Sequence, residues 1–429
     1  MTSATPVQRL QEIVRIPTVS GSGEPFERLL ATMREQWPLV HELSVVRVRE
    51  HGLLIHWPGR SAQRPVVLMA HLDVVPVSGT WTRDPFSGTV ADGAVHGRGT
   101  LDDKGCVAAV CEAVESLLRE GFVPSYDVWL SFGCDEEVSG GAAVDAVEIL
   151  GERGVSPWLV LDEGGAVAHE AFPGVGAPVA VVGVAEKGTT TLRVTATGDG
   201  GHASTPARRG PTTRLAEAIV ALERNPMPPR IPPTAVELFE RLAPHAPIVL
   251  RPLLARAGAL RPLLGRVLPR IGGEAAALVR TTFAVTTLAG SPAHNVIAAS
   301  ASAGVNVRVM PGDTVADVVA HVRRVTGLEV DVVEYGEAST LSRYDDDAFA
   351  HICATTATHF PDAVVAPYVV LAATDSRFFH AISERVFRFA PFRMTKAQRA
   401  SIHGGDEHLG VDDFLTGVAW YRDLIETLP

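Results

Sequence analysis

The sequence predicts an α/β protein, with a mostly parallel sheet sandwiched by helices and a smaller α+β lid domain inserted in the chain. In the first 185 residues and again near the C-terminus, short runs rich in β-branched residues alternate with helical patterns. This alternation is typical of a parallel sheet covered on both faces. Between these parts, longer stretches alternate apolar and polar residues as half-exposed antiparallel strands do. We therefore expect two kinds of sheet in one chain.

The N-terminal part carries three candidate strands and one pronounced helix. A helical pattern over Pro6–Trp37 is interrupted by Pro17 and by a Gly/Ser turn. The stretch Gly105–Glu120 has the apolar spacing of a helix with one buried face. Strands are predicted at Val66–Ala70, Val128–Phe132 and Leu159–Leu161.

The pattern changes near residue 186 and changes back near residue 336. The elements predicted between these points are strands at Thr189–Thr197, Thr281–Thr287 and Ala301–Val309 and helices at Thr212–Arg224 and Thr314–Val325. The α/β pattern then returns with a strand within Ala363–Ala373 and a C-terminal helix over Val411–Thr427. One domain is therefore expected to be inserted within another.

An insertion near 225–280 is rich in proline, arginine and leucine. It holds 10 of the 30 prolines within 225–270, and no acidic residue lies between Glu240 and Glu274. This composition is compatible with a membrane-surface or apolar-substrate element. Because prolines interrupt any long amphipathic helix there, we favour a structural insertion of short helices on the lid or at a subunit contact.

Composition excludes several classes of function. The net charge of −11 argues against a nucleic-acid partner, whose footprint is basic. No apolar run approaches the roughly 18 residues that a membrane span needs, and no secretory signal is readable in the first 20 residues. The four cysteines have no C-x-x-C spacing and are expected to be free thiols. We therefore expect a cytoplasmic protein without a membrane partner.

Acidic residues and histidines follow the predicted strands. His71 and Asp73 come directly after the first strand, a glycine-rich turn ends in Asp102, and pairs of acidic residues follow the next two strands. Ligands of α/β sheets bind outside the carboxyl ends of the strands. Carboxylates crowded there would repel one another, and bound divalent cations remove that cost. Oxygen and imidazole ligands without cysteine suit zinc, and also cobalt or manganese.

Each of these signals is weak when taken alone. A single His-x-Asp at a strand end is usually structural, and two adjacent glutamates usually begin a solvated helix. The GRG turn is similar to a phosphate-binding loop but lacks the G-x-G-x-x-G and G-K-[ST] patterns. The combination in this order is far more specific than any part of it.

The motifs taken together resemble a known family. HLDVVP, GRGTLDDKG, DEEVSG, LDEGG, GHAS, AHNVIAAS, TDSR and HGGDE occur in the family's order and cover essentially the whole chain. The chain is similar to the di-zinc amidohydrolases and exopeptidases that include acetylornithine deacetylase, succinyl-diaminopimelate desuccinylase, glutamate carboxypeptidase and aminoacylase. LDEGG, TDSRFF and FRFAPF look closest to the carboxypeptidase S and N-acyl-amino-acid hydrolase branch. The resemblance implies a zinc exopeptidase-like fold.

The resemblance also implies two zinc ions per chain, held by five residues. Asp162 is preferred to Glu163 as a ligand, although a shift by one residue is possible in that motif. Relatives hold the peptide after the bridging aspartate in cis, so a cis bond is expected between Asp102 and Asp103. The implied ligands are His71 and Asp162 for one zinc, Glu137 and His403 for the other, and Asp102 between the two.

Further residues take roles in catalysis and substrate binding through the same resemblance. Asp73 would orient His71, and Glu136 would act as the general base toward a water shared by the two metals. His202 in GHAS would stabilise the oxyanion, often from the partner subunit in this family. Two departures, Phe378 after TDSR and Ala298-Ala299 after the NVI segment, put the acyl preference in doubt. The candidate substrate contacts are Asn295, Arg308 and Arg377; for either arginine the alternative is a surface ion pair.

The activity implied is hydrolysis of the amide bond of small N-acyl-amino acids or dipeptides that bear a free carboxylate. Two alternatives stay open: a deacylase of a biosynthetic intermediate, of the acetylornithine or succinyl-diaminopimelate type, and an inactive metal-binding homologue. A homodimer through the lid domain is possible. The expected division is a catalytic domain in two parts, 1–185 and 337–429, with a lid or dimerisation domain at 186–336 between them.

Overall fold

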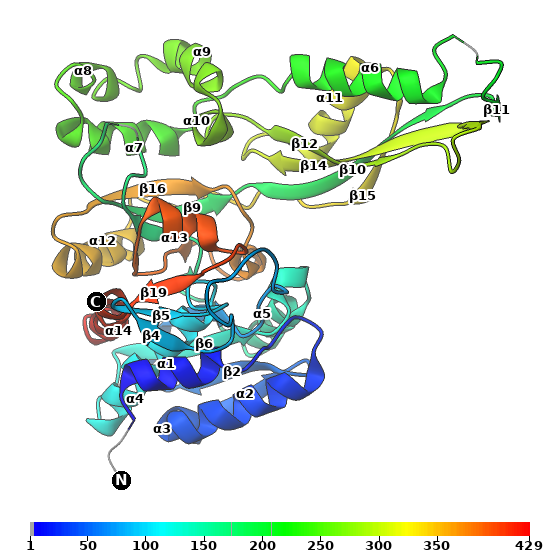
Figure 1. The fold of residues 1–429 in the computed structure, drawn as a ribbon. Helices are drawn as coiled ribbons and strands as arrows, with labels where there is room; N and C mark the ends of the chain where they lie inside the picture. Colours follow the sequence, from blue (N-terminus) through cyan, green and yellow to red (C-terminus); the bar gives the residue numbers. More distant parts are fainter. Residues whose placement is uncertain (1–3, 173, 207) are drawn as a thin grey trace.

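The computed structural model describes residues 4–172, 174–206 and 208–429. Its largest feature is a ten-stranded sheet that is parallel at its centre, where β6, β3 and β7 lie side by side (Figure 1). The order is β1 (Ser44–Val48), β2 (Gly52–Trp57), β6 (Tyr126–Gly133), β3 (Ser61–His71), β7 (Leu159–Asp162), β17 (Val386–Arg388), β9 (Val179–Glu186), β8 (Ala166–Ala168) and β18 (Arg393–Met394), with β16 (Val364–Val370) paired to β9.

Helices cover this sheet as the alternating pattern predicts. The apolar stripe of α4, which includes Val107, Val110 and Val114, is fully buried, and α4 packs against β3 and α14. Helix α5 packs on β6 and β1 through its own buried alanines. The helices are α1 (Pro6–Val14), α2 (Gly23–Gln36), α3 (Pro38–Glu42), α4 (Lys104–Arg119), α5 (Ala142–Glu152), α12 (Asp347–His359), α13 (Lys396–Ser401) and α14 (Val411–Glu426), with short 3-10 turns η1 (Glu136–Val138) and η3 (Asp375–Ala381).

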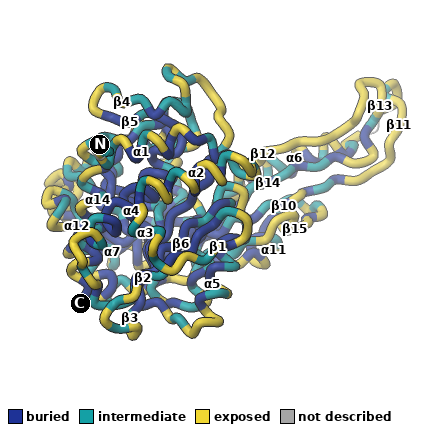
Figure 2. Tube along the Cα trace, turned by 90° about the horizontal axis from the view of Figure 1, so that it is seen from below, coloured by how far each residue is buried: buried dark blue, intermediate teal, exposed yellow. Residues whose placement is uncertain are grey.

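A second, four-stranded antiparallel sheet extends away from the first as an elongated arm (Figures 1 and 2). Its alternating sequence gives one buried face, whose residues form a separate core with α6 and α11. Helix α11 begins at a capping box formed by Thr314 and Asp317 and ends at Gly327 in the left-handed conformation. The elements are β10 (Gly188–Thr197), β12 (Thr282–Ala289), β14 (Ser300–Val309), β15 (Glu329–Glu334), α6 (Pro211–Arg224) and α11 (Val315–Thr326), with the pair β11 (Gly201–His202) and β13 (Val296–Ile297) at the tip.

The chain enters this arm at Lys187, between β9 and β10, and leaves it after β15. We propose on this basis the division into 1–185, 186–336 and 337–429. At the junction, the Lys187 amide donates to the Val370 carbonyl, and its buried Nζ donates to the Arg280 carbonyl at 2.8 Å.

The proline-rich insertion consists of short helices, and its first helix lies between two cores. Leu238 and Leu242 of α7 pack with β9 and β16 of the large sheet, whereas Ala235 and Phe239 pack toward α8 and α9. The insertion is therefore shared with the large sheet rather than carried by the lid alone. Its elements are α7 (Pro233–Leu242), η2 (Ala243–His245), α8 (Arg251–Leu254), α9 (Arg261–Ile271) and α10 (Gly273–Ala277).

A small sheet of β4 (Thr89–Ala91), β5 (Ala94–His96) and β19 (His408–Gly410) brings the C-terminal HGGDE segment next to the glycine-rich turn. Among the described residues, no helix combines the length and the apolar character that crossing a bilayer requires. The parallel centre of the large sheet places the ends of β3, β6 and β7 at one edge, as expected from the sequence.

Candidate functional site

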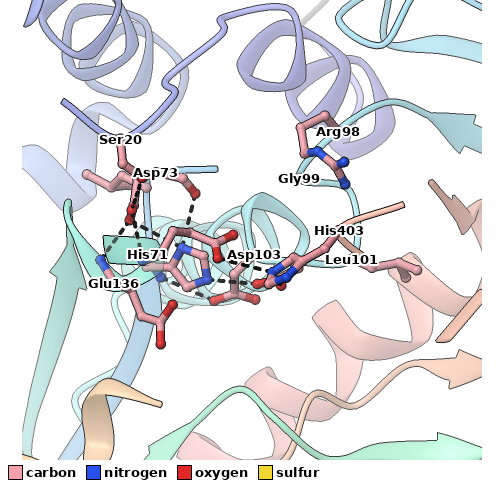
Figure 3. Close-up of polar contacts among 12 residues, drawn as sticks. Ser20, His71, Asp73, Arg98, Gly99, Leu101, Asp103, Glu136 and His403 are labelled. Atoms are coloured by element: carbon pink, nitrogen blue, oxygen red, sulfur yellow. Dashed lines mark hydrogen bonds and ion pairs between the residues drawn. The ribbon is translucent and has the colours of Figure 1, made fainter. Parts of the chain in front are cut away.

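Histidine and carboxylate side chains from four distant segments meet at this edge of the sheet (Figure 3). The Nε2 atom of His71 lies 2.8 Å from Oδ1 of Asp102. The Nε2 atom of His403 lies 3.0 Å from Oδ2 of the same carboxylate and 3.1 Å from Oε2 of Glu137. One ligand atom from each of His71, Asp102 and Glu137 lies within 4.8 Å of the others. The Asp102 carboxylate therefore sits between two imidazoles, one oxygen toward each.

The electrostatics of this cluster are those of a site for positive charge. Burial alone would raise the pKa of Asp102, but hydrogen bonds and charge from His403 and His71 lower it. Contacts with Asp102 and Glu137 raise the pKa of His403 to about 10. Protons on the two imidazoles thus occupy the positions between nitrogen and oxygen ligands that a cation would take.

Asp73 organises the cluster from behind. Its side chain is fully buried, and its two oxygens accept hydrogen bonds from the amides of Glu136 and Glu137 at 3.2 and 3.1 Å and from the Ser20 hydroxyl at 2.8 Å. Nδ1 of His71 lies 3.4 Å from Asp73 Oδ1 and 3.0 Å from the Asp73 carbonyl oxygen. A buried carboxylate behind a ligating histidine fixes its tautomer and orientation. One side chain therefore orients both His71 and the turn that presents Glu137.

The peptide bond between Asp102 and Asp103 is cis, as the resemblance implied. Asp103 is fully buried, and its Oδ2 accepts a hydrogen bond from the His71 amide at 3.2 Å. Its Oδ1 and Oε1 of Glu137 are buried without a hydrogen-bond partner in the described part of the chain. Unpartnered buried oxygens beside two imidazoles fit a site whose remaining ligand is a hard or borderline cation such as zinc.

Glu136 is held beside the cluster by the same turn, with its amide bound to Asp73. Burial raises the pKa of its carboxyl group to about 9, as do the charges of Asp375, Asp102 and Glu137, while His71 lowers it. A carboxylate that is poorly stabilised as an anion has a strong affinity for a proton. This arrangement suits a general acid and base.

The LDEGG motif places its two acidic residues differently. Oδ2 of Asp162 accepts a hydrogen bond from the Ser376 amide at 3.0 Å. Burial raises the pKa of Glu163 well above its usual range, and the charges that raise it further are led by those of Asp102 and Asp103. One oxygen of Asp162 is therefore bound at the Ser376 turn, whereas Glu163 experiences the charges of Asp102 and Asp103; the sequence favoured Asp162 as the ligand.

The two lid residues His202 and Asn295 lie together, but far from this cluster. His202 and Val296 face each other in the β11–β13 pair, and the Ala203 amide donates to the Asn295 carbonyl at 3.0 Å. Both His202 and Asn295 are exposed at the tip of the elongated arm (Figure 2). Nδ1 of His202 lies 2.8 Å from the Ser204 hydroxyl. The structure does not bring either residue to the metal ligands.

The two candidate arginines lie nearer the junction between the sheets. Arg308, near the end of β14, donates to the Thr189 hydroxyl at 2.8 Å, and burial lowers the pKa of its guanidinium. Arg377 follows Thr374 in η3, donates to its carbonyl at 2.8 Å and stacks on Phe378 at 4.5 Å. The partners of Arg308 and Arg377 are thus a hydroxyl, a carbonyl and an aromatic ring.

Several residues that shape the cluster could not be identified from the sequence. Ser20 lies in the N-terminal Gly/Ser turn, more than 50 residues from its partner Asp73, and no local pattern marks it. Asp103 was expected only as one half of a cis peptide, yet its side chain also holds the His71 amide. Side-chain direction at such positions is set by tertiary contacts rather than by spacing.

Comparisons with known proteins agree with the fold. The sequence model of the family described as "Peptidase family M20/M25/M40" matches residues 67–427. The chain is 33% identical over 443 residues to probable carboxypeptidase S-like 2 of Dictyostelium discoideum, covering 98% of this chain and 84% of that one. It is 32% identical over 436 residues to the human N-fatty-acyl-amino acid synthase/hydrolase PM20D1, covering 98% and 87%. The M20 family metallo-carboxypeptidase Sso-CP2 from Sulfolobus solfataricus has the same fold, with a TM-score of 0.72 at 17% identity over 99% of both chains.

The fold and the site thus define a two-sheet hydrolase with a candidate metal centre at the edge of the larger sheet. The chain belongs to peptidase family M20/M25/M40. The resemblance found in its motifs is therefore confirmed, and so is the mostly parallel α/β fold.

Proposed function

We propose that this protein hydrolyses the amide bond of small N-acyl-amino acids or dipeptides with a free carboxylate, and that it depends on two divalent cations, zinc in the first place. The observation that carries this proposal is the chain of contacts from His71 through Asp102 to His403 and Glu137. A carboxylate that offers one oxygen to each of two imidazoles is suited to bridge two metal ions. Four or five such ligands with no cysteine match the ligand preferences of zinc.

One ligand set needs a choice between neighbours. We assign His71 and Glu163 to one cation, with Asp102 shared, because the charges of Asp102 and Asp103 raise the pKa of Glu163 while one oxygen of Asp162 is bound to the Ser376 amide. Glu137 and His403 complete the other cation's ligands. Bound cations would polarise the amide carbonyl and make the attacking water more acidic.

The protein's own residues then move the proton. Glu136 takes a proton from the water that attacks the carbonyl carbon, and it delivers this proton to the nitrogen of the leaving amine. Cations held by these ligands would lower the pKa of Glu136, so that its carboxylate would be ionised before attack. Asp73 fixes the positions of Glu136 and His71 relative to each other, through its contacts with the Glu136 amide and the His71 imidazole.

Substrate binding would use residues of the second sheet and of the 337–429 part. Arginine binds a free carboxylate through two parallel hydrogen bonds, and Arg308 and Arg377 have neutral partners that such a group would replace. His202 would donate to the developing oxyanion. Because His202 lies at the exposed tip of the arm, closure of the lid or a second subunit must bring it to the cluster.

Metal content decides the proposal most directly. We expect two equivalents of zinc per chain, loss of hydrolysis after treatment with a chelator, and recovery on addition of zinc or cobalt. A panel of acetyl, long-acyl and dipeptidyl substrates then separates N-acyl-amino-acid hydrolysis from deacylation of a biosynthetic intermediate. The names of the relatives, which include an N-fatty-acyl-amino acid hydrolase and a carboxypeptidase, favour the first. A folded protein that hydrolyses these substrates without metal would contradict the mechanism.

A further inference from the structure

A second carboxylate, which takes no part in the chemistry above, lies behind the metal ligands. Glu407 ends the HGGDE segment and is fully buried. Its Oε1 accepts hydrogen bonds from the amides of Leu101 at 2.8 Å and Asp102 at 3.2 Å. Its Oε2 accepts from the Gly99 amide at 3.1 Å. One side chain from the His403 loop thus satisfies three amides of the loop that carries Asp102.

Arg98 ties the same two loops in the opposite direction. Its guanidinium is also buried, and Nη1 donates to Oε2 of Glu407 at 2.5 Å. Nη2 donates to the carbonyl of Gly404, next to His403, at 2.8 Å. Backbone pairing adds a bond from the Gly97 amide to the Glu407 carbonyl at 2.9 Å. Figure 3 shows Arg98, Gly99 and Leu101 beside His403. The two loops are therefore joined by charge-assisted bonds from both sides.

We propose that Glu407 is a positioning residue that fixes Asp102 relative to His403, so that both can bind the same cation. This inference rests on the proposed metal site. Two contacts of Asp102 show why the position of Glu407 matters. The Asp102 amide is bound to the Glu407 side chain, and the Asp102 carboxylate lies 3.0 Å from the side chain of His403. His403 stands four residues before Glu407 in the sequence, so both contacts are made with the same loop. A shift of the Asp102 loop against the His403 loop would open this gap directly. Groups that orient metal ligands typically change metal affinity 10–100-fold when they are altered.

The chain offers a matched control for a merely structural role. Glu112 is also buried and also paired with a buried arginine, Arg9, and it accepts a hydrogen bond from the Trp37 indole at 2.9 Å. It lies in α4 and contacts none of the proposed metal ligands through these bonds. Substitutions at Glu112 and Glu407 should therefore destabilise the fold in similar ways, while only those at Glu407 should disturb the metal site.

The test measures zinc affinity by competition with a chromogenic chelator, together with thermal unfolding of the metal-free protein. The variants are Glu407→Asp, Glu407→Gln, Glu112→Asp and Glu112→Gln. Aspartate keeps the charge but is one methylene too short to reach three amides at once. We expect both Glu407 variants to bind zinc at least tenfold more weakly than wild type. Both Glu112 variants should stay within about twofold of wild type while showing a comparable loss of thermal stability.

Three results would overturn the proposal: wild-type affinity in both Glu407 variants, weakening in Glu407→Gln alone, which would indicate a charge effect, or equal weakening in the Glu112 variants. If Glu407→Gln fails to fold, Arg98→Lys gives the answer, because a lysine cannot reach Glu407 and the Gly404 carbonyl together. Affinity several-fold weaker supports the proposal, and unchanged affinity contradicts it. A wild-type protein that binds no zinc would instead overturn the metal site itself, and this inference with it.

Discussion

The candidate metal cluster and the tip of the lid differ in how completely one chain assembles them. The cluster collects His71, Asp102, Glu137 and His403 within hydrogen-bonding distance, and Asp73 holds the first and third of these from behind. At the tip, His202 and Asn295 are exposed, and within the described part of the chain they contact the neighbouring Ser204 and Ala203 in the β11–β13 pair. The first region is built to hold charge before any substrate arrives. The second is complete only when something else approaches it.

This difference has a physical origin. Strand ends of a parallel sheet converge by topology, so ligands on them meet as soon as the sheet forms. A long antiparallel arm carries its tip away from the large sheet. The arm buries its apolar residues in a core of its own with α6 and α11, and this core does not depend on the cluster. Such an arm can move as a unit when its junction bends. Substitutions in the cluster and substitutions at the tip of the arm are therefore expected to impair the enzyme in different ways.

The largest effect is expected at Glu136. If this carboxylate moves the proton as proposed, Glu136→Gln should lower kcat at least 100-fold, the lower end of the effect of a general acid or base. Steady-state kinetics and zinc content are measured together. Glu148→Gln, on the exposed face of α5, serves as the control. Turnover that stays intact in Glu136→Gln would remove the residue from the mechanism, and lost zinc would make it a ligand instead.

A somewhat smaller effect is expected at the lid tip. His202→Ala should lower kcat/KM about 100-fold, which is typical for loss of one oxyanion donor, without changing zinc content or unfolding temperature. Ser204→Ala removes the neighbouring hydroxyl and is expected to matter far less. Full activity of His202→Ala would show that the exposed tip has no role in catalysis.

A mixing experiment sharpens the comparison further. Glu136→Gln and His202→Ala chains are combined so that mixed dimers form. If His202 acts across a subunit boundary, one site in such a dimer has both functional residues, and activity returns. If the lid closes over its own chain, each site keeps a defect and no activity returns. Both outcomes retain a role for His202 and differ only in the source of the lid.

A third prediction separates the acidic neighbours of the LDEGG motif. Because Asp162 binds the Ser376 amide and the charges of Asp102 and Asp103 raise the pKa of Glu163, we expect Glu163→Gln to weaken one of two zinc equivalents at least tenfold. Asp162→Asn should retain both equivalents and lose mainly thermal stability. Zinc titration and unfolding of both variants provide the measurement. The reverse pattern would return the ligand role to Asp162.

The sequence was informative where chemistry and topology coincide. The sequence correctly placed residues at the ends of predicted strands, such as His71 after Val66–Ala70. A buried β-branched run marks a strand, and the first polar residue after the run marks its end. The helix predicted at Gly105–Glu120 occurs at Lys104–Arg119, since its apolar spacing leaves one stripe to bury. Motif order then indicated that distant segments such as HGGDE belong to the same site.

The sequence was uninformative where a side chain's direction decides its role. Asp162 and Glu163 are adjacent and equally acidic, and only the packing of the Ser376 turn separates them. Glu407 stood in a motif next to His403, yet its contacts with the Asp102 loop depend on the small sheet that pairs β19 with β5. The shared packing of α7 was likewise hidden, because a helix with two apolar faces does not show which partner takes each.

The smallest effect is expected at the junction between the two regions, where Lys187 is buried. Burial lowers the pKa of its amine to about 8, from 10.5 in the unfolded chain. Between these values the unfolded state binds more protons, so the stability of wild type rises with pH, by at most about 3 kcal/mol from this group. Below pH 8 the folded protein carries the full cost of the buried charge.

Lys187→Met removes this titration. The variant should therefore be most favoured relative to wild type near pH 7 and lose that advantage as the pH rises from 8 to 10.5, as measured by urea unfolding at several pH values. Lys396→Met, at an exposed lysine, is the control. A stability difference independent of pH would show that burial does not lower the pKa of the junction amine. If the lid moves about this junction, the same substitution should also change KM more than kcat, because it touches neither the cluster nor the tip.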